Sequence, residues 1–203
     1  MKIPDTLFNR VVRPSLFILL LLPACYYSYG YWQETLGANP LEAIIRGLGD
    51  WALRILLIIL AISPLRRLLN WPQILRIRRM LGLYTYFYTA LHLMGYLWFE
   101  QFFDWEETWF DIKERPFITI GMVATVLLTP LAITSTKGMI RRLGKNWKRL
   151  HFLIYPISIM AVIHFWWMVK LDATEPMIYS VILTILLVER LIRKISTIHY
   201  TSS

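Results

Sequence analysis

Runs of apolar residues follow one another along almost the whole chain, and short stretches rich in charged residues separate them. A helix needs about 20 mainly apolar residues to cross the hydrocarbon core of a bilayer. The pattern therefore predicts an all-α fold, a polytopic membrane helix bundle with six transmembrane helices in a single domain over residues 1–203. The predicted spans cover residues 12–32, 48–65, 80–99, 117–134, 150–169 and 176–191, and no repeated segment stands out.

The composition agrees with a membrane protein. Hydrophobic residues make up 57% of the 203 residues, whereas soluble domains are usually about 45–50% apolar. Near the N-terminus, Lys2, Arg10 and Arg13 precede an apolar run, as in a signal peptide. No small-x-small cleavage motif follows this run, so we expect an uncleaved first transmembrane helix.

The charged residues are distributed unequally between the two sets of connections. Although the net charge is +9, 17 of the 22 Lys and Arg residues fall in one set and 11 of the 13 acidic residues in the other. Because positive loops stay in the cytoplasm, this asymmetry predicts a bacterial inner-membrane protein with both termini cytoplasmic. No soluble basic face remains, which argues against nucleic-acid binding.

Two kinds of connection have alternative interpretations. The acidic segment from Glu100 to Glu114 is either a solvated outer loop or a docking surface for a basic periplasmic partner. The basic stretches Arg66–Arg79 and Lys137–Arg149 anchor the topology, and they could also bind an anionic flavin phosphate or a cytoplasmic electron donor. The single cysteine, Cys25, excludes an internal disulfide, an iron–sulfur site and thioether-linked haem.

Histidines in the third and fifth predicted spans are the main candidates for chemistry, because a polar residue within the membrane marks a functional site by default. His92 lies about 20 Å beyond Arg79 and His164 about 22 Å beyond Arg149, at a rise of about 1.5 Å per residue. The two imidazoles should therefore reach the same depth on two helices. This arrangement predicts axial ligation of one haem iron, with no open position for oxygen.

His151 lies at the cytoplasmic end of the fifth span, about 20 Å from His164 along the helix axis. It is a candidate ligand for a second haem. On an ideal helix the two side chains point roughly 140° apart, although Pro156 between them could kink the helix. The third span offers no histidine at this level, so a second haem would need another ligand. His199, in the polar tail, is expected to be an ordinary surface residue.

Several blocks of sequence resemble the MsrQ (YedZ) family of the ferric-reductase-like transmembrane group. The block Trp147–His151, followed by a second histidine 13 residues later, is the most specific of these. The others are Gly49–Arg54, Ser63–Arg67, Arg78–Leu83 leading to His92, Leu131–Ser135 with Arg141–Gly144, and His164–Trp167.

The resemblance implies a function that spacing alone does not reveal. Members of this family pass respiratory electrons to a periplasmic molybdopterin subunit, MsrP, which reduces methionine sulfoxide in oxidised periplasmic proteins. Haem b and FMN are the implied cofactors, with His92, His151 and His164 at the haem positions. Catalysis would reside in the partner, and no residue of this chain is expected to be catalytic.

Three alternatives remain open. A self-contained ferric reductase or NADPH oxidase would carry a nicotinamide domain, but the sequence has no G-x-G-x-x-G loop, so we expect electrons from the quinone pool or a separate flavin reductase. A cytochrome b-type subunit of another reductase differs from the MsrQ interpretation only through the resemblance. In a non-redox transporter, Arg54 would be a substrate-binding charge.

Overall fold

The computed structural model describes residues 4–201, and the side chains of residues 4–196. Within this part the chain is helical, without strands, as the apolar pattern predicts. The elements, in chain order, are α1 (Asp5–Leu7), the π-helix η1 (Phe8–Val12), α2 (Arg13–Trp32), α3 (Pro40–Leu68), the 3₁₀-helix η2 (Pro72–Ile77), α4 (Arg78–Gly95), the π-helix η3 (Tyr96–Glu100), α5 (Trp105–Glu114), α6 (Pro116–Ile133), α7 (Lys137–Leu143), α8 (Lys145–His151), α9 (Ile154–Met168) and α10 (Thr174–Thr201).

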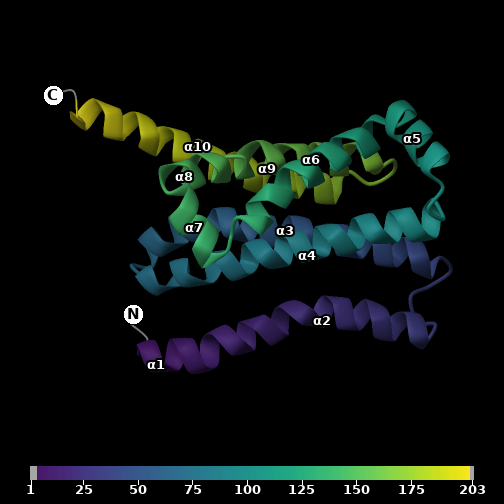
Figure 1. Ribbon diagram of the computed structural model, residues 1–203, viewed down its shortest axis with the longest axis horizontal. Coiled ribbons are helices and arrows are strands. Elements are labelled where there is room, and N and C mark those ends of the chain that lie inside the picture. Colours follow the sequence, from purple (N-terminus) through teal and green to yellow (C-terminus); the bar gives the residue numbers. More distant parts are fainter. Residues whose placement is uncertain (1–3, 202–203) are drawn as a thin grey trace.

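The long helices run side by side along one axis (Figure 1). Helix α3 is central, because it packs mainly against α4 and also contacts α2, α9 and α10, while α6 packs mainly against α9. Helix α5 lies at one end of the bundle, and α7 and α8 lie at the other end, together with both chain termini (Figure 1). This common end for the termini agrees with an even number of membrane crossings.

Four stretches of helix are long and apolar enough to cross a membrane. Within the described part of the chain they are Asp5–Trp32, Pro40–Leu68, Pro116–Ile133 and Lys145–Met168. Helices α4 and α10 coincide with the other two predicted spans, but α4 carries arginines, tyrosines and a histidine, and α10 carries charged residues near both ends of its apolar stretch. The four helices support a membrane protein, and the count of six spans stays a prediction.

Helix boundaries differ from the predicted spans where polar residues extend a helix. Helix α3 begins eight residues before the predicted span, because the Asn39 side chain caps it by accepting from the N–H of Glu42 and Pro40 occupies the first turn. An ion pair between Glu42 and Arg46, at 2.5 Å, supports the added turns. These turns lack an apolar run, so a search for apolar runs does not find them.

Helix α2 is attached to the bundle through tyrosine hydroxyl groups. Tyr88, which is fully buried, donates to the carbonyl of Leu20 at 2.6 Å and accepts from the N–H of Ala24 at 3.3 Å. The hydroxyl therefore lies between the N–H of Ala24 and the carbonyl of Leu20, four residues earlier in α2. This position is next to Pro23, where a side chain can replace the helical hydrogen bond. Tyr84 donates to the carbonyl of Phe17 at 2.8 Å, one turn earlier.

Candidate functional site

The side chains of His92 and His164 meet in the middle of the bundle. His92 lies on α4 and His164 on α9, and their ring centroids are 6.1 Å apart with the ring planes at 82°. The depth argument from the sequence predicts this meeting. Both rings line a cavity bounded by α3, α4, α6 and α9.

A backbone carbonyl orients each imidazole. Nδ1 of His92 lies 2.7 Å from the carbonyl oxygen of Ile45 on α3, and Nδ1 of His164 lies 2.6 Å from that of Phe117 on α6. A carbonyl can only accept, so both Nδ1 atoms carry the proton. Each Nε2 therefore keeps its lone pair, which is the protonation state that a metal-ligating histidine needs.

Two glycines give the imidazoles room to lie close to the neighbouring helices. A Cβ on Gly49 of α3 would lie 3.1 Å from the ring of His92, and a Cβ on Gly121 of α6 would lie 2.9 Å from the ring of His164. Any larger residue would push the ring away from its carbonyl partner. Small side chains continue on the same helices, where Ala52 and Ala124 also line the cavity.

The spacing of the rings fits a metal held between two imidazoles. With a metal–nitrogen bond of about 2 Å, and a ring nitrogen about 1 Å from the ring centre, two rings on opposite sides of one metal have centroids about 6 Å apart. No group of three or more His, Cys, Asp or Glu side chains forms a metal site among the described residues. Two imidazoles thus suit an iron whose other ligands come from a porphyrin, and a mainly apolar cavity suits the flat faces of that ring.

The two halves of the site are related by an internal repeat. Residues of α3 and α4 have counterparts 72 positions later in the chain. The pairs are Ile45 and Phe117, Gly49 and Gly121, Ala52 and Ala124, Leu56 and Leu128, Ser63 and Ser135, and His92 and His164. Five of these six pairs are identical residues, and in both halves 47 residues separate the histidine from its carbonyl partner. The pair α3–α4 therefore corresponds to the pair α6–α9, as in membrane proteins built from parallel repeats.

The sequence prediction that no repeated segment stands out is thus corrected. The repeat is weak because few residues match, although the matches include the histidines, the glycines and the alanines that line the cavity. The two glycines were missed for the same reason. A comparison of the segments that precede His92 and His164 would have found both.

The central cavity continues towards the bundle end that carries α5. A second hollow adjoins it there and shares Arg46, Asp50, Phe165 and Met168 with it. The loop between α9 and α10 lines this hollow. Asp172 in that loop accepts from the N–H of Thr174 at 2.9 Å, and hydrogen bonds from the side chain and backbone of Thr174 lower the pKa of its carboxyl group.

A buried carboxylate links the cavity wall to α5. Asp111 of α5 is 3% exposed and accepts from Tyr96, which lines the cavity, at 3.2 Å and from Gln101 at 2.7 Å. Arg115 pairs with its other oxygen at 3.3 Å. The acidic segment is therefore partly helical and attached to the bundle, while most of its side chains are exposed to solvent as expected.

His151 lies apart from this pair, at the end of the bundle that carries the termini. Its ring stacks on Trp147 with centroids 3.9 Å apart, and its Nδ1 lies 3.0 Å from the carbonyl oxygen of Trp147. The predicted fifth span breaks at Phe152 and Leu153 into α8 and α9, so the ideal-helix angle to His164 does not apply. The break precedes Pro156, which sits in the first turn of α9, where proline is tolerated. The side chain of His199 lies outside the described residues.

Arg54 is engaged within the protein. Its Nε donates to the hydroxyl of Tyr179 at 2.8 Å, its guanidinium lies 4.0 Å from the carboxylate of Asp50, and it stacks over Trp51 at 5.4 Å. These contacts join α3 to α10 and give Arg54 a structural role. They weaken the interpretation of Arg54 as a substrate-binding charge in a transporter.

Comparison with known proteins identifies the family. Residues 46–162, more than half of the chain, match the family model described as "Ferric reductase like transmembrane component". A relative from Rhodospirillum rubrum, named "Protein-methionine-sulfoxide reductase heme-binding subunit MsrQ", is 49% identical over 91% of this chain and 89% of its own length. The chain belongs to the MsrQ family.

Other MsrQ proteins agree closely. The relative from Azospira oryzae is 47% identical over 91% of this chain and 80% of its own length. The relative from Xanthomonas campestris pv. campestris (strain B100) is 48% identical over 91% of this chain and 87% of its own length. No solved structure is significantly similar to the chain. The resemblance found in the sequence blocks is confirmed, and the protein is a ferric-reductase-like membrane protein of the MsrQ family.

Proposed function

We propose that the protein holds haem b between His92 and His164 and carries electrons across the bacterial inner membrane. The observation that carries this proposal is the pair of imidazoles 6.1 Å apart, each with its Nδ1 proton fixed on a backbone carbonyl. Ligation through both Nε2 atoms would leave the iron six-coordinate. Such an iron favours electron transfer over oxygen chemistry, which requires an open position.

The proposed electron acceptor is a periplasmic molybdopterin subunit of the MsrP type, which reduces methionine sulfoxide in oxidised periplasmic proteins. The names of the relatives support a partnership with a methionine-sulfoxide reductase. The second hollow beside the cavity brings the proposed haem close to the protein surface at the end that carries α5. The acidic α5, fixed by Asp111, supplies a rigid surface for a basic partner.

The proposed electron donor is the quinone pool or a cytoplasmic flavin reductase, and FMN is a further cofactor that the family resemblance implies. His151 is the proposed ligand of a second haem nearer the cytoplasm. Its Nδ1 lies against the carbonyl of Trp147, and its ring also interacts with the backbone of Leu131, so ligation would require the second of these contacts to break.

The proposed topology has six spans with both termini in the cytoplasm. The position of both termini at one end of the bundle supports it (Figure 1), as do the basic helices α7 and α8 at the same end. The acidic α5 at the opposite end would then face the periplasm. This orientation places the His92–His164 pair on the acceptor side.

Haem content of histidine variants tests the function. We expect His92→Ala and His164→Ala each to remove the low-spin spectrum of the haem between them and electron delivery to the periplasmic partner, because each removes an axial bond. His151→Ala should leave this spectrum largely intact. His199→Ala, in the C-terminal turns, is the matched control. Full haem with an unchanged spectrum in His92→Ala would refute the proposed pair.

The second candidate function is that of a cytochrome b-type subunit for another reductase. The same histidine pair and cavity favour it equally, because the haem site does not determine the acceptor. Electron delivery separates the two candidates. Reduced protein that is reoxidised by the periplasmic methionine-sulfoxide reductase supports the first candidate, and reduced protein that is not reoxidised supports the second.

A further inference from the structure

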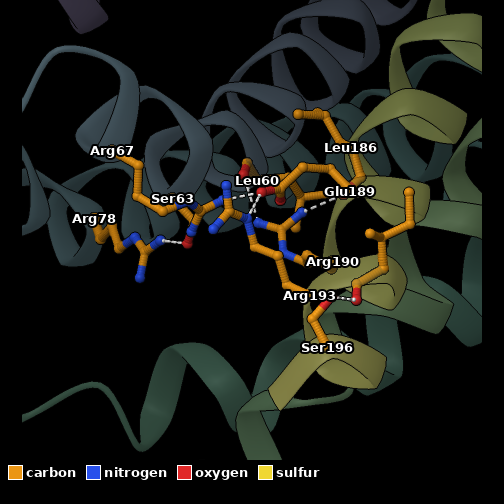
Figure 2. Close-up of polar contacts among 10 residues, drawn as sticks. Leu60, Ser63, Arg67, Arg78, Leu186, Glu189, Arg190, Arg193 and Ser196 are labelled. Carbon is orange, nitrogen blue, oxygen red and sulfur yellow. Dashed lines mark hydrogen bonds and ion pairs between the residues drawn. The ribbon is translucent and has the colours of Figure 1, made fainter. Parts of the chain in front are cut away.

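Arginines from three helices gather around Glu189 (Figure 2), near the C-terminal end of α3 and the start of α4. Arg67 of α3 and Arg193 of α10 both pair with Glu189 of α10. Arg190 of α10 donates to the carbonyls of Leu60 and Leu186, and Arg78 of α4 donates to the hydroxyl of Ser63. We call Arg67, Arg78, Arg190 and Arg193, with Glu189, the arginine cluster.

Among the described side chains, the positive charge of this cluster exceeds the negative charge that faces it. Glu189 is the one carboxylate of the cluster, while the partners of Arg78 and Arg190 are a hydroxyl and carbonyl groups. The Nε atoms of Arg67 and Arg78 are buried and have no hydrogen-bond partner among the described residues, and the same holds for one carboxylate oxygen of Glu189, Oε2. The positive charge of Arg78 is repelled by those of Arg66, Arg67 and Arg190. Partly buried cations of one sign are costly unless an anion compensates them.

The surroundings of the cluster indicate which anion fits. A planar guanidinium can donate two parallel hydrogen bonds, the geometry that phosphate oxygens accept. Arg190 also lies over the ring of Tyr155 at 5.4 Å, which restricts its guanidinium plane. Beside the cluster on α10, Leu191, Ile192 and Ile195 are between 49% and 59% exposed, so an apolar surface for acyl chains adjoins the charges.

We propose that the arginine cluster binds a phosphate group, supplied by the head group of an anionic phospholipid in the surrounding bilayer. Basic pockets between transmembrane helices on the cytoplasmic side bind anionic lipid head groups in this way. A soluble phosphate ester has the same recognition chemistry, so the experiment distinguishes the two sources. The inference does not depend on haem, since none of these residues lines the His92–His164 cavity.

The test uses the full-length protein in nanodiscs of phosphatidylcholine, with and without cardiolipin. Native mass spectrometry would detect retained lipid, and thermal unfolding would report its stabilising effect. We expect cardiolipin to remain bound to wild type and to raise its unfolding midpoint. The variants Arg78→Gln and Arg190→Gln should need about tenfold more cardiolipin to reach half of the maximum rise in unfolding midpoint. Arg79→Gln, an exposed neighbour on the same helix, is the matched control and should behave as wild type.

Each other outcome has a defined meaning. If inorganic phosphate or FMN stabilises wild type in pure phosphatidylcholine and cardiolipin does not, the phosphate comes from a soluble ester and the lipid source is refuted. If Arg78→Gln and Arg79→Gln weakened cardiolipin binding equally, the lipid would be attracted by general surface charge, and the specific site would be refuted. Wild type that retains neither lipid nor phosphate would overturn the proposal, even if the variants failed to fold. Haem spectra of the same samples report the His92–His164 site independently.

Discussion

Substitution of Gly121 by alanine tests the geometry of the histidine pair, because it adds a single methyl group beside the ring of His164. The added Cβ would lie 2.9 Å from Cε1 and Nδ1 of His164, whereas ordinary contacts begin at 3.4 Å, so the ring must retreat by about 0.5 Å. This movement strains the 2.6 Å hydrogen bond to Phe117. Such a bond contributes about 0.5–1.5 kcal/mol, and its loss would weaken haem binding about two- to tenfold.

A second effect of the substitution has the opposite sign. Alanine stabilises a helix interior by about 1 kcal/mol relative to glycine, so α6 itself should not be weakened. Loss of haem from Gly121→Ala would therefore come from the displaced ring and not from an unfolded helix. Gly49→Ala, with a contact of 3.1 Å to His92, should show a smaller loss, and Gly82→Ala, with no atom within 4 Å, should show none.

The assay is haem content per protein, together with the reduced-minus-oxidised spectrum and the rate of haem transfer to an acceptor protein. We expect the transfer rate to fall in the order Gly121→Ala, Gly49→Ala and then Gly82→Ala, with the last equal to wild type. If Gly121→Ala retained haem as wild type does, with the same spectrum and transfer rate, His164 would not ligate iron from the position described here.

Three further predictions concern topology, electron donors and helix attachment. A reporter fused after Ser203 should be active only in the cytoplasm and one inserted near Trp109 only in the periplasm; the reverse pattern would invert the proposed direction of electron flow. Purified protein should not reduce its haem with NADPH alone, because the sequence has no G-x-G-x-x-G loop; rapid reduction without an added flavoprotein would contradict this. Tyr88→Phe should lower the unfolding midpoint by about 2–4 °C, since it removes hydrogen bonds worth about 1 kcal/mol, whereas the exposed Tyr29→Phe should not; equal midpoints would show that the Tyr88 hydroxyl does not hold α2.

The all-helical fold and the relative depth of the two histidines could be predicted because each depends on residues close in sequence. The meeting of His92 and His164 follows from two counts of residues beyond basic helix ends, at a constant rise per residue. The start of α3 at Pro40 could not be found in this way, since its first turns depend on a cap and an ion pair. The break before Pro156 depends equally on local turns that an ideal helix does not contain.

The groups that position the histidines were also not predicted. The carbonyls of Ile45 and Phe117 are backbone atoms, which every residue has, so the sequence carries no sign of their role. Gly49 and Gly121 are visible in the sequence, but their meaning depends on a neighbouring helix 43 residues further along the chain. Only the packed structure brings each glycine against its ring.

The internal repeat has a consequence for maturation of the protein. Each helical hairpin, α3–α4 or α6–α9, provides one of the two proposed ligands, so neither hairpin alone can complete the coordination of an iron. An iron bound between His92 and His164 would join the hairpins much as a covalent cross-link does. Cofactor insertion would then be the event that locks the two hairpins into one bundle, and protein made without haem would be the preferred target of membrane proteases.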